Sequence, residues 1–137
     1  MRKEELAPAE KSNQGDNCRD ARIARPHERL QCWKDAVELV VETYRLTDPF
    51  PVREIYGLTS QMRRAAVSVP SNIAEGVARH GAGERKQFLF IARGSLSELE
   101  TQVIIAEKLG YIGVEVKNRF LEATGKVGAM LNGLLRR

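Results

Sequence analysis

"LTSQMRRAAVSVPSNIAEGVA", residues 58–78, is the stretch that decides the fold. Apolar residues recur in it every three or four positions, the spacing that lines one face of an α-helix. This stripe consists of Leu58, Met62, Ala65, Val69, Ile73 and Gly76. Pro70 lacks an amide hydrogen and clashes with the preceding turn, so we expect the helix to be kinked. Ser68 and Ser71 can bond to freed backbone groups or to a neighbouring chain, and Asn72 is expected to be a buried amide with satisfied hydrogen bonds.

The same helical period continues on both sides of this stretch and predicts helices over about 30–46, 84–109 and 114–135. Their expected core stripes are Trp33, Ala36, Val37, Val40, Val41 and Tyr44; Phe88, Ala92, Ser95, Leu99, Val103 and Ala106; and Val116, Phe120, Ala123, Val127, Leu131 and Leu134. Prolines end the first helix at "TDPFP", and "RHGAG" is typical of a turn between helices. No alternation long enough for a strand is present. Four helices with short connections predict an all-α, antiparallel up-down four-helix bundle with a kinked second helix.

Length and composition favour one globular domain in a reduced, cytoplasmic setting. The chain has 137 residues, 42% of them hydrophobic, and a net charge of +4. No apolar run is long enough to span a membrane, the N-terminus has no secretory signal, and only Cys18 and Cys32 could form a disulfide. Residues 1–28 are poor in apolar side chains and are predicted to be a disordered tail, with the bundle occupying residues 29–137.

The second and third predicted helices have a second apolar side, opposite their core stripes. Its residues are Val67, Ala74 and Ala78 on one helix, and Phe90, Ser97, Thr101 and Ile104 on the other. The alternative is scattered surface alanine and serine, which is common. Because both middle helices show the pattern, we favour a subunit interface and therefore a closed homo-oligomer.

Catalysis and metal binding have little support in the sequence. His27 and His80, the only histidines, have no nucleophile or carboxylate partner at a recognisable spacing, and neither CxxC nor HExxH is present. "HGAGERK" lacks the spacing of a phosphate-binding loop and is interpreted as a turn. Glu98 and Glu100 are expected to form ordinary ion pairs with arginine or lysine. We therefore predict a protein that is not an enzyme and needs no cofactor or metal.

A set of basic residues could instead contact phosphates. The candidates are Arg63, Arg64, Arg79, Arg85, Lys86 and Arg93. No aromatic residues are interleaved with them, so recognition should follow the shape and backbone of a nucleic acid more than its bases. The alternative is that these side chains solubilise exposed helices or pair with glutamates.

Four segments carry a family resemblance: "LQCWKDAVELV", "YGLTSQMRRAAVSVPSNIAEG", "FLFIARGSLSELETQ" and "EKLGYI". They closely resemble the bacterial four-helix-bundle proteins encoded in intervening sequences of large-subunit ribosomal RNA genes. The similarity covers residues 30–135 and extends to the accessory variability determinant protein of diversity-generating retroelements. It implies a homopentamer with a basic surface and, in the retroelement relatives, binding to RNA and to a reverse transcriptase.

The sequence thus predicts a non-enzymatic oligomeric module that binds structured RNA or a nucleoprotein. The alternative is a homo-oligomeric scaffold that recruits a protein partner, such as a reverse transcriptase, with no direct role in binding nucleic acid.

Overall fold

The computed structural model describes residues 25–137, and the predicted tail over residues 1–24 lies outside them. The described residues form two short 3-10 helices and four α-helices, with no strand. They are η2 (Pro26–Arg29), α2 (Gln31–Thr47), η3 (Val52–Glu54), α3 (Leu58–Val77), α4 (Ala82–Lys108) and α5 (Val114–Arg136). The prediction of four helices without a strand is therefore confirmed for this part of the chain. Ordered structure also includes the turn η2, which precedes the expected domain boundary at residue 29.

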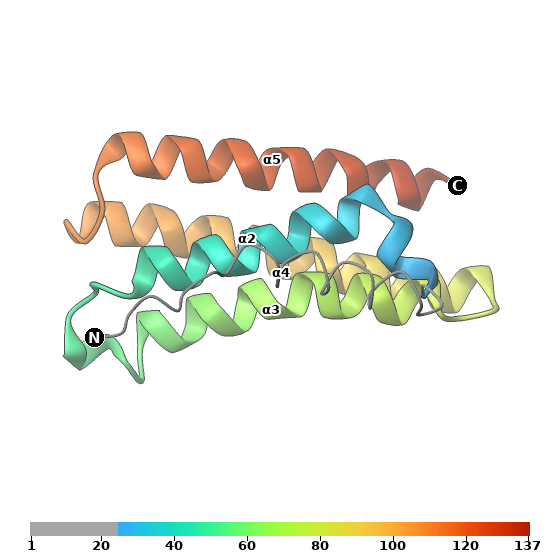
Figure 1. Cartoon of the computed structure of the whole chain (residues 1–137), viewed down its shortest axis with the longest axis horizontal. Helices are drawn as coiled ribbons and strands as arrows, with labels where there is room; N and C mark the ends of the chain where they lie inside the picture. Colours follow the sequence, from blue (N-terminus) through green and yellow to red (C-terminus); the bar gives the residue numbers. More distant parts are fainter. Residues whose placement is uncertain (1–24) are drawn as a thin grey trace, which may run out of the picture.

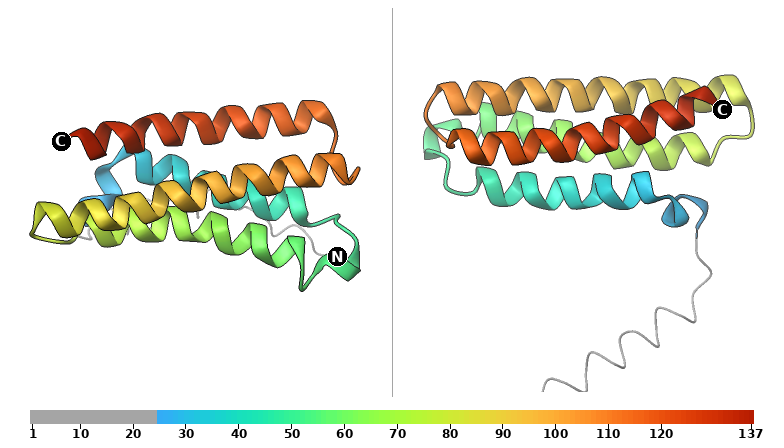
Figure 2. Two further views of the ribbon diagram at one scale, coloured as in Figure 1. Left: turned by 180° about the vertical axis from the view of Figure 1, so that it is seen from behind. Right: turned by 90° about the horizontal axis from the view of Figure 1, so that it is seen from above.

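The four helices lie side by side, and each packs against its neighbours in the sequence. The first and last, α2 and α5, also contact each other, whereas the pairs α2 with α4 and α3 with α5 do not. Figure 1 shows the chain turning back at each connection, and the two views of Figure 2 show these connections alternating between the ends of the bundle. The α3–α4 turn therefore lies near the start of α2 and the end of α5.

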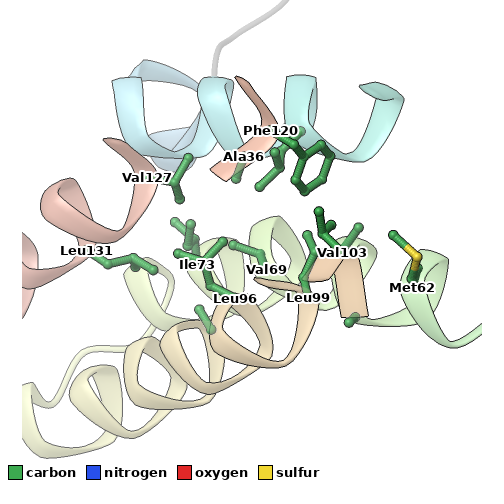
Figure 3. Close-up of a cluster of buried hydrophobic side chains, with 14 of the residues drawn as sticks. Ala36, Met62, Val69, Ile73, Leu96, Leu99, Val103, Phe120, Val127 and Leu131 are labelled. Carbon is green, nitrogen blue, oxygen red and sulfur yellow. The ribbon is translucent and has the colours of Figure 1, made fainter. Parts of the chain in front are cut away.

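The core is densest where α3 and α4 face each other. Met62, Val69 and Ile73 of α3 meet Leu99 and Val103 of α4, and all five side chains are fully enclosed (Figure 3). The stripe predicted for α3 is confirmed at its centre. Each fully buried leucine, isoleucine or methionine contributes about 2–3 kcal/mol through removal of apolar surface from water.

The stripe predicted for α2 is wrong in part. Val41 and Tyr44 were expected in the core but are exposed, while Leu39, Thr43 and Thr47 are buried. The two threonine hydroxyls donate to carbonyl oxygens one turn earlier, at 2.7 Å for Thr43 and 2.8 Å for Thr47. Because these bonds satisfy the hydroxyls within the helix, both threonines can occupy apolar positions.

A similar shift occurs on α5, where the predicted core residue Ala123 is exposed and Thr124 is buried. The Thr124 hydroxyl donates to Glu100 Oε2 of α4 at 2.6 Å. Glu100 was expected to form an ion pair with a basic residue. Within residues 25–137 its partner is this threonine, and none of the ion pairs there engages Glu98.

Helix α3 continues through Pro70, which is buried. Ser68 Oγ shares a 2.7 Å hydrogen bond with Ser95 Oγ of α4. Asn72 Nδ2 donates to the carbonyl oxygen of Ser68 at 2.8 Å and to its hydroxyl at 2.9 Å. The Asn72 amide nitrogen is hydrogen-bonded as predicted, although the residue is partly buried rather than buried, and Ser68 joins α3 to α4.

At Gly76 the backbone of α3 lies close to α4. A Cβ atom at this position would lie 3.1 Å from the Arg85 carbonyl oxygen and 3.2 Å from Phe88 Cβ. Such contacts are tighter than most side-chain contacts, so glycine allows the start of α4 to lie directly against α3. The absence of a side chain at Gly76 therefore sets the position of the α3–α4 turn and its basic residues.

Candidate functional site

The six predicted phosphate-binding residues do not form one surface. Arg63 and Arg64 lie near the start of α3, and Arg79 lies just after its end. The 13 helical residues 65–77 lie between Arg64 and Arg79, which corresponds to about 20 Å along the axis. The structure therefore divides the predicted patch into a group at each end of α3, with Arg93 apart from both on α4.

The first group surrounds the α3–α4 turn. Arg85 and Lys86 line a hollow of about 280 Å³ together with Arg137. Its other lining residues are mainly apolar: Pro26, Leu30, Val77, Ala82, Leu89 and Leu134. Within residues 25–137, none of the ion pairs engages Arg85, Lys86 or Arg137. This end of the bundle therefore presents three cations whose charge no contacting carboxylate neutralises.

Arg79 belongs to the same end but is already engaged. Its Nη2 atom pairs with Glu75 one turn earlier, and its guanidinium lies over the Phe88 ring at 4.8 Å from the centroid. Its Nε is buried and has no hydrogen-bond partner among the described residues. Arg79 therefore helps to hold α3 against α4, and its charge is partly neutralised.

Arg93 is engaged on the other side of α4. Its Nη1 donates to Asn132 Oδ1 of α5 at 3.0 Å, and its guanidinium lies over the Phe90 ring at 5.0 Å. Since the Arg93 side chain is exposed, it still presents its charge to solvent. It therefore adds a separate cation near the seam of α4 and α5.

The second group lies where α3 begins. Arg63 Nε donates to Thr47 Oγ1 at 2.9 Å, and its guanidinium lies over the Tyr44 ring at 4.5 Å. Arg64 is exposed and lines hollows on both sides of α3, one with Tyr44 and one with Tyr56. Sequence reasoning missed these tyrosines because it assigned Tyr44 to the core and because Tyr56 lies in the connection before α3, outside the helical pattern.

The residues predicted to form a subunit interface lie on the outside of this single chain. Phe90 is 50% exposed, and Val67 and Ile104 are 40% and 38% exposed. Ala78, Ser97 and Thr101 are also exposed, and Ala74 is partly buried. Val67 and Ala74 lie on α3, Ala78 directly follows it, and the other four residues lie on α4. Ile91 and Ile105 of α4 are also exposed apolar residues, which sequence reasoning did not single out.

The groove between α2 and α5 differs in charge from the α3–α4 end. Its rim carries acidic residues of α2 opposite Arg119 and Lys126 of α5. The acidic residues are Asp35, Glu38 and Glu42, with Glu122 on α5. Because negatively and positively charged side chains are mixed along this groove, it is much less suited to a polyanion than the hollow at the α3–α4 turn.

No metal site or membrane-spanning helix occurs in the described part of the chain. Residues 25–137 contain no group of three or more histidine, cysteine, aspartate or glutamate side chains that could hold a metal ion. None of the helices there is both long and apolar enough to cross a membrane. Neither histidine was predicted to be catalytic. His27 packs edge-on against Trp33 at 4.9 Å between ring centroids, and His80 is exposed.

Comparison with solved structures finds a similar fold in Bacteroides thetaiotaomicron. That crystal structure is of a protein with unknown function from the S23 ribosomal protein family, 16% identical to this chain with a TM-score of 0.70. The match covers 77% of this chain and 99% of that one. No curated protein matches the chain. At this identity the likeness shows the fold alone.

Comparison with protein families gives a match over most of the bundle. The family described as 23S rRNA-intervening sequence protein matches residues 28–133, which include all of α2, α3 and α4 and most of α5. This agrees with the resemblance found in the sequence. The chain therefore belongs to the 23S rRNA-intervening sequence protein family.

Proposed function

We propose that the protein is a non-enzymatic, homo-oligomeric module that binds structured RNA in the cytoplasm through its basic surface. The observation that carries this proposal is the unneutralised cation cluster of Arg85, Lys86 and Arg137 at the α3–α4 end. Clustered cations bind phosphates and release counterions, which favours association with nucleic acid. The family description, which ties its members to 23S rRNA genes, supports RNA as the polyanion.

Self-association supports the same proposal because an oligomer would carry one copy of the basic cluster on each subunit. The two apolar stripes on α3 and α4 suit a heterologous contact, in which one stripe of each subunit packs on the other stripe of the next. Such contacts close into a ring, and we propose the pentamer of antiparallel bundles that the family resemblance implies. Each ring would then carry several copies of the basic end and bind RNA with increased avidity.

Substitution on α4 tests this interface. Ile104→Lys places a charge on the α4 stripe and should reduce the particle mass measured by light scattering. Ala129→Lys, at an exposed site on α5 outside the predicted interface, should leave the mass unchanged. Equal masses for both variants would contradict the assigned interface.

The RNA-binding proposal is tested by replacing Arg79, Arg85 and Lys86 together with alanine. Because Arg79 also packs α3 against α4, a second variant replaces Arg85, Lys86 and Arg137, the three cations of the hollow. For this variant the affinity for a structured RNA hairpin, measured by filter binding, should fall, and the slope of log affinity against log salt should become shallower by about 2–3. The control is Arg119→Ala with Lys126→Ala, which removes cations from the mixed-charge α2–α5 groove and should have little effect. Unchanged affinity of the Arg85, Lys86 and Arg137 variant at low salt would refute the assigned surface.

The alternative is a scaffold that recruits a protein partner such as a reverse transcriptase. Leu109 and Val114, which flank the α4–α5 connection, are 54% and 52% exposed and lie outside the predicted self-interface. Exposed apolar side chains of this kind are typical of protein contacts. Affinity capture of partners before and after nuclease treatment separates the two functions, because a partner bound only by protein contacts survives the nuclease.

A further inference from the structure

The connection between α2 and α3 presents an almost fully exposed aromatic side chain. Tyr56 is 96% exposed. The residues around it are held by Glu54, whose Oε1 accepts the Leu58 amide hydrogen bond at 3.0 Å and whose Oε2 accepts the Tyr111 hydroxyl bond at 2.7 Å. These bonds tie the connection both to the start of α3 and to the α4–α5 connection. Tyr56 therefore projects from an anchored segment, and its exposed ring is available to a ligand.

A polar hollow of about 570 Å³ lies beside this ring, between α3 and α4. Its lining is Tyr56, Ser60, Gln61, Arg64, Ala65, Ser68, Ser95 and Glu98. The hydrogen bond between Ser68 and Ser95 crosses the seam of the two helices within this lining. The hollow thus combines an aromatic ring of the α2–α3 connection with a cation and an amide of α3 and a carboxylate of α4.

This combination matches the chemistry of an unpaired nucleotide. An exposed tyrosine ring offers a face on which a base can stack, and arginine binds the phosphate. Glutamine and glutamate side chains can bond to the edge of a base, and a carboxylate accepts hydrogen bonds from exocyclic amino groups. Within residues 25–137, neither Arg64 nor Glu98 takes part in an ion pair, so both are available to a ligand.

The hollow on the other side of Arg64 provides a path for an adjoining nucleotide. It is lined by Tyr44 of α2, Ile55 of the connection, and Thr59, Ser60, Arg63, Arg64 and Val67 of α3, with a volume of about 390 Å³. Arg63 already lies over the Tyr44 ring, so its guanidinium is held at this surface. Two hollows that share Ser60 and Arg64 could therefore follow a single strand across the start of α3 as far as Val67, which is one of the predicted interface residues.

We propose that the Tyr56 hollow binds an unpaired base of RNA. The base stacks on Tyr56, its phosphate contacts Arg64, and its amino-bearing edge faces Gln61 and Glu98. This inference rests on the proposed RNA-binding function and adds a single-stranded element to it. It also revises the expectation, drawn from the spacing of aromatic residues in the sequence, that recognition uses only backbone and shape.

The test uses a short, unstructured cytidine oligonucleotide and the full-length chain, with binding followed by fluorescence anisotropy. Stacking on an aromatic side chain is worth about 1–3 kcal/mol per base, so Tyr56→Ala should weaken binding by about 5- to 150-fold. Tyr56→Phe keeps the ring and should bind as the original chain does. Val52→Ala, at another exposed side chain of the same connection, should have no effect.

Three results would overturn the inference. Suppose that Tyr56→Ala binds the oligonucleotide with unchanged affinity while the Arg85, Lys86 and Arg137 variant has reduced affinity for the RNA hairpin. The Tyr56 site is then refuted and the proposed function stands. If Tyr56→Ala lowers the particle mass, Tyr56 is a subunit contact instead. If the original chain binds neither the oligonucleotide nor the hairpin, both proposals fail.

A second variant tests the role of the carboxylate. Cytosine carries an exocyclic amino group where uracil carries a carbonyl, so the original chain should prefer oligocytidine to oligouridine. Glu98→Gln, which also presents an amide donor, should reduce this preference. An equal affinity for both oligonucleotides in the original chain would exclude Glu98 from reading the base.

Discussion

Replacing Gly76 by alanine tests the close approach that positions the α3–α4 turn. The added Cβ would lie 3.1 Å from a backbone oxygen of α4, and that atom can move only if the helix moves. Overpacking of this kind costs about 1–3 kcal/mol, while replacing a glycine within a helix by alanine contributes about 1 kcal/mol. We therefore expect Gly76→Ala to lower the free energy of unfolding by about 0–2 kcal/mol.

Gly125→Ala is the matched control, because a Cβ there meets no atom within 4 Å. It should raise the free energy of unfolding by about 1 kcal/mol, since only the helix propensity changes. The two variants should therefore differ by about 1–3 kcal/mol in urea unfolding at one protein concentration. If Gly76→Ala stabilises the chain as much as Gly125→Ala does, the two helices are not in the contact described.

Three further changes address the loop anchor, the buried thiol and the core. The hydrogen bonds from the Leu58 amide and the Tyr111 hydroxyl lower the pKa of Glu54 in the folded chain. The ionised carboxylate therefore contributes its full stabilisation above the usual pKa of 4.5, and this stabilisation is lost as the pH falls through the lower pKa of the folded state. Glu54→Gln should accordingly show a smaller loss of stability than the original chain between pH 7 and 3, and equal losses would contradict this. Burial and, to a smaller extent, the charge of Asp35 raise the pKa of the Cys32 thiol to about 11. In a Cys18→Ser chain, Cys32 should therefore react with a thiol reagent at pH 8 only after unfolding. Rapid reaction of the folded chain would show that the thiol is accessible. Leu99→Ala removes a fully buried side chain and should cost about 2–5 kcal/mol in urea unfolding, whereas a cost below 1 kcal/mol would place Leu99 outside the core.

Apolar periodicity was sufficient to predict the helices but not every buried position. On α3, the buried residues are aliphatic or small, so Met62, Val69 and Ile73 follow the expected stripe. On α2, a hydropathy pattern treats Thr43 as polar although its hydroxyl is satisfied within the helix. The predicted face was therefore rotated toward Val41, which the structure leaves exposed.

The candidate site was harder to predict because it depends on contacts between distant segments. Arg63 and Arg64 are recognisable as basic residues, but their neighbours Tyr44 and Tyr56 come from α2 and the following connection. Likewise, Arg79 has the same charge as Arg85 in the sequence, and only the structure shows that Glu75 neutralises part of it. Sequence thus identified the charged groups, while their grouping and availability required the fold.

The central claim is that the outward apolar residues of α3 and α4 pack against further copies of the chain. Sedimentation equilibrium of the full-length protein tests it most directly. We predict a mass near five times the 15.4 kDa of one chain. A single species of 15.4 kDa at all concentrations from micromolar upward would contradict the claim.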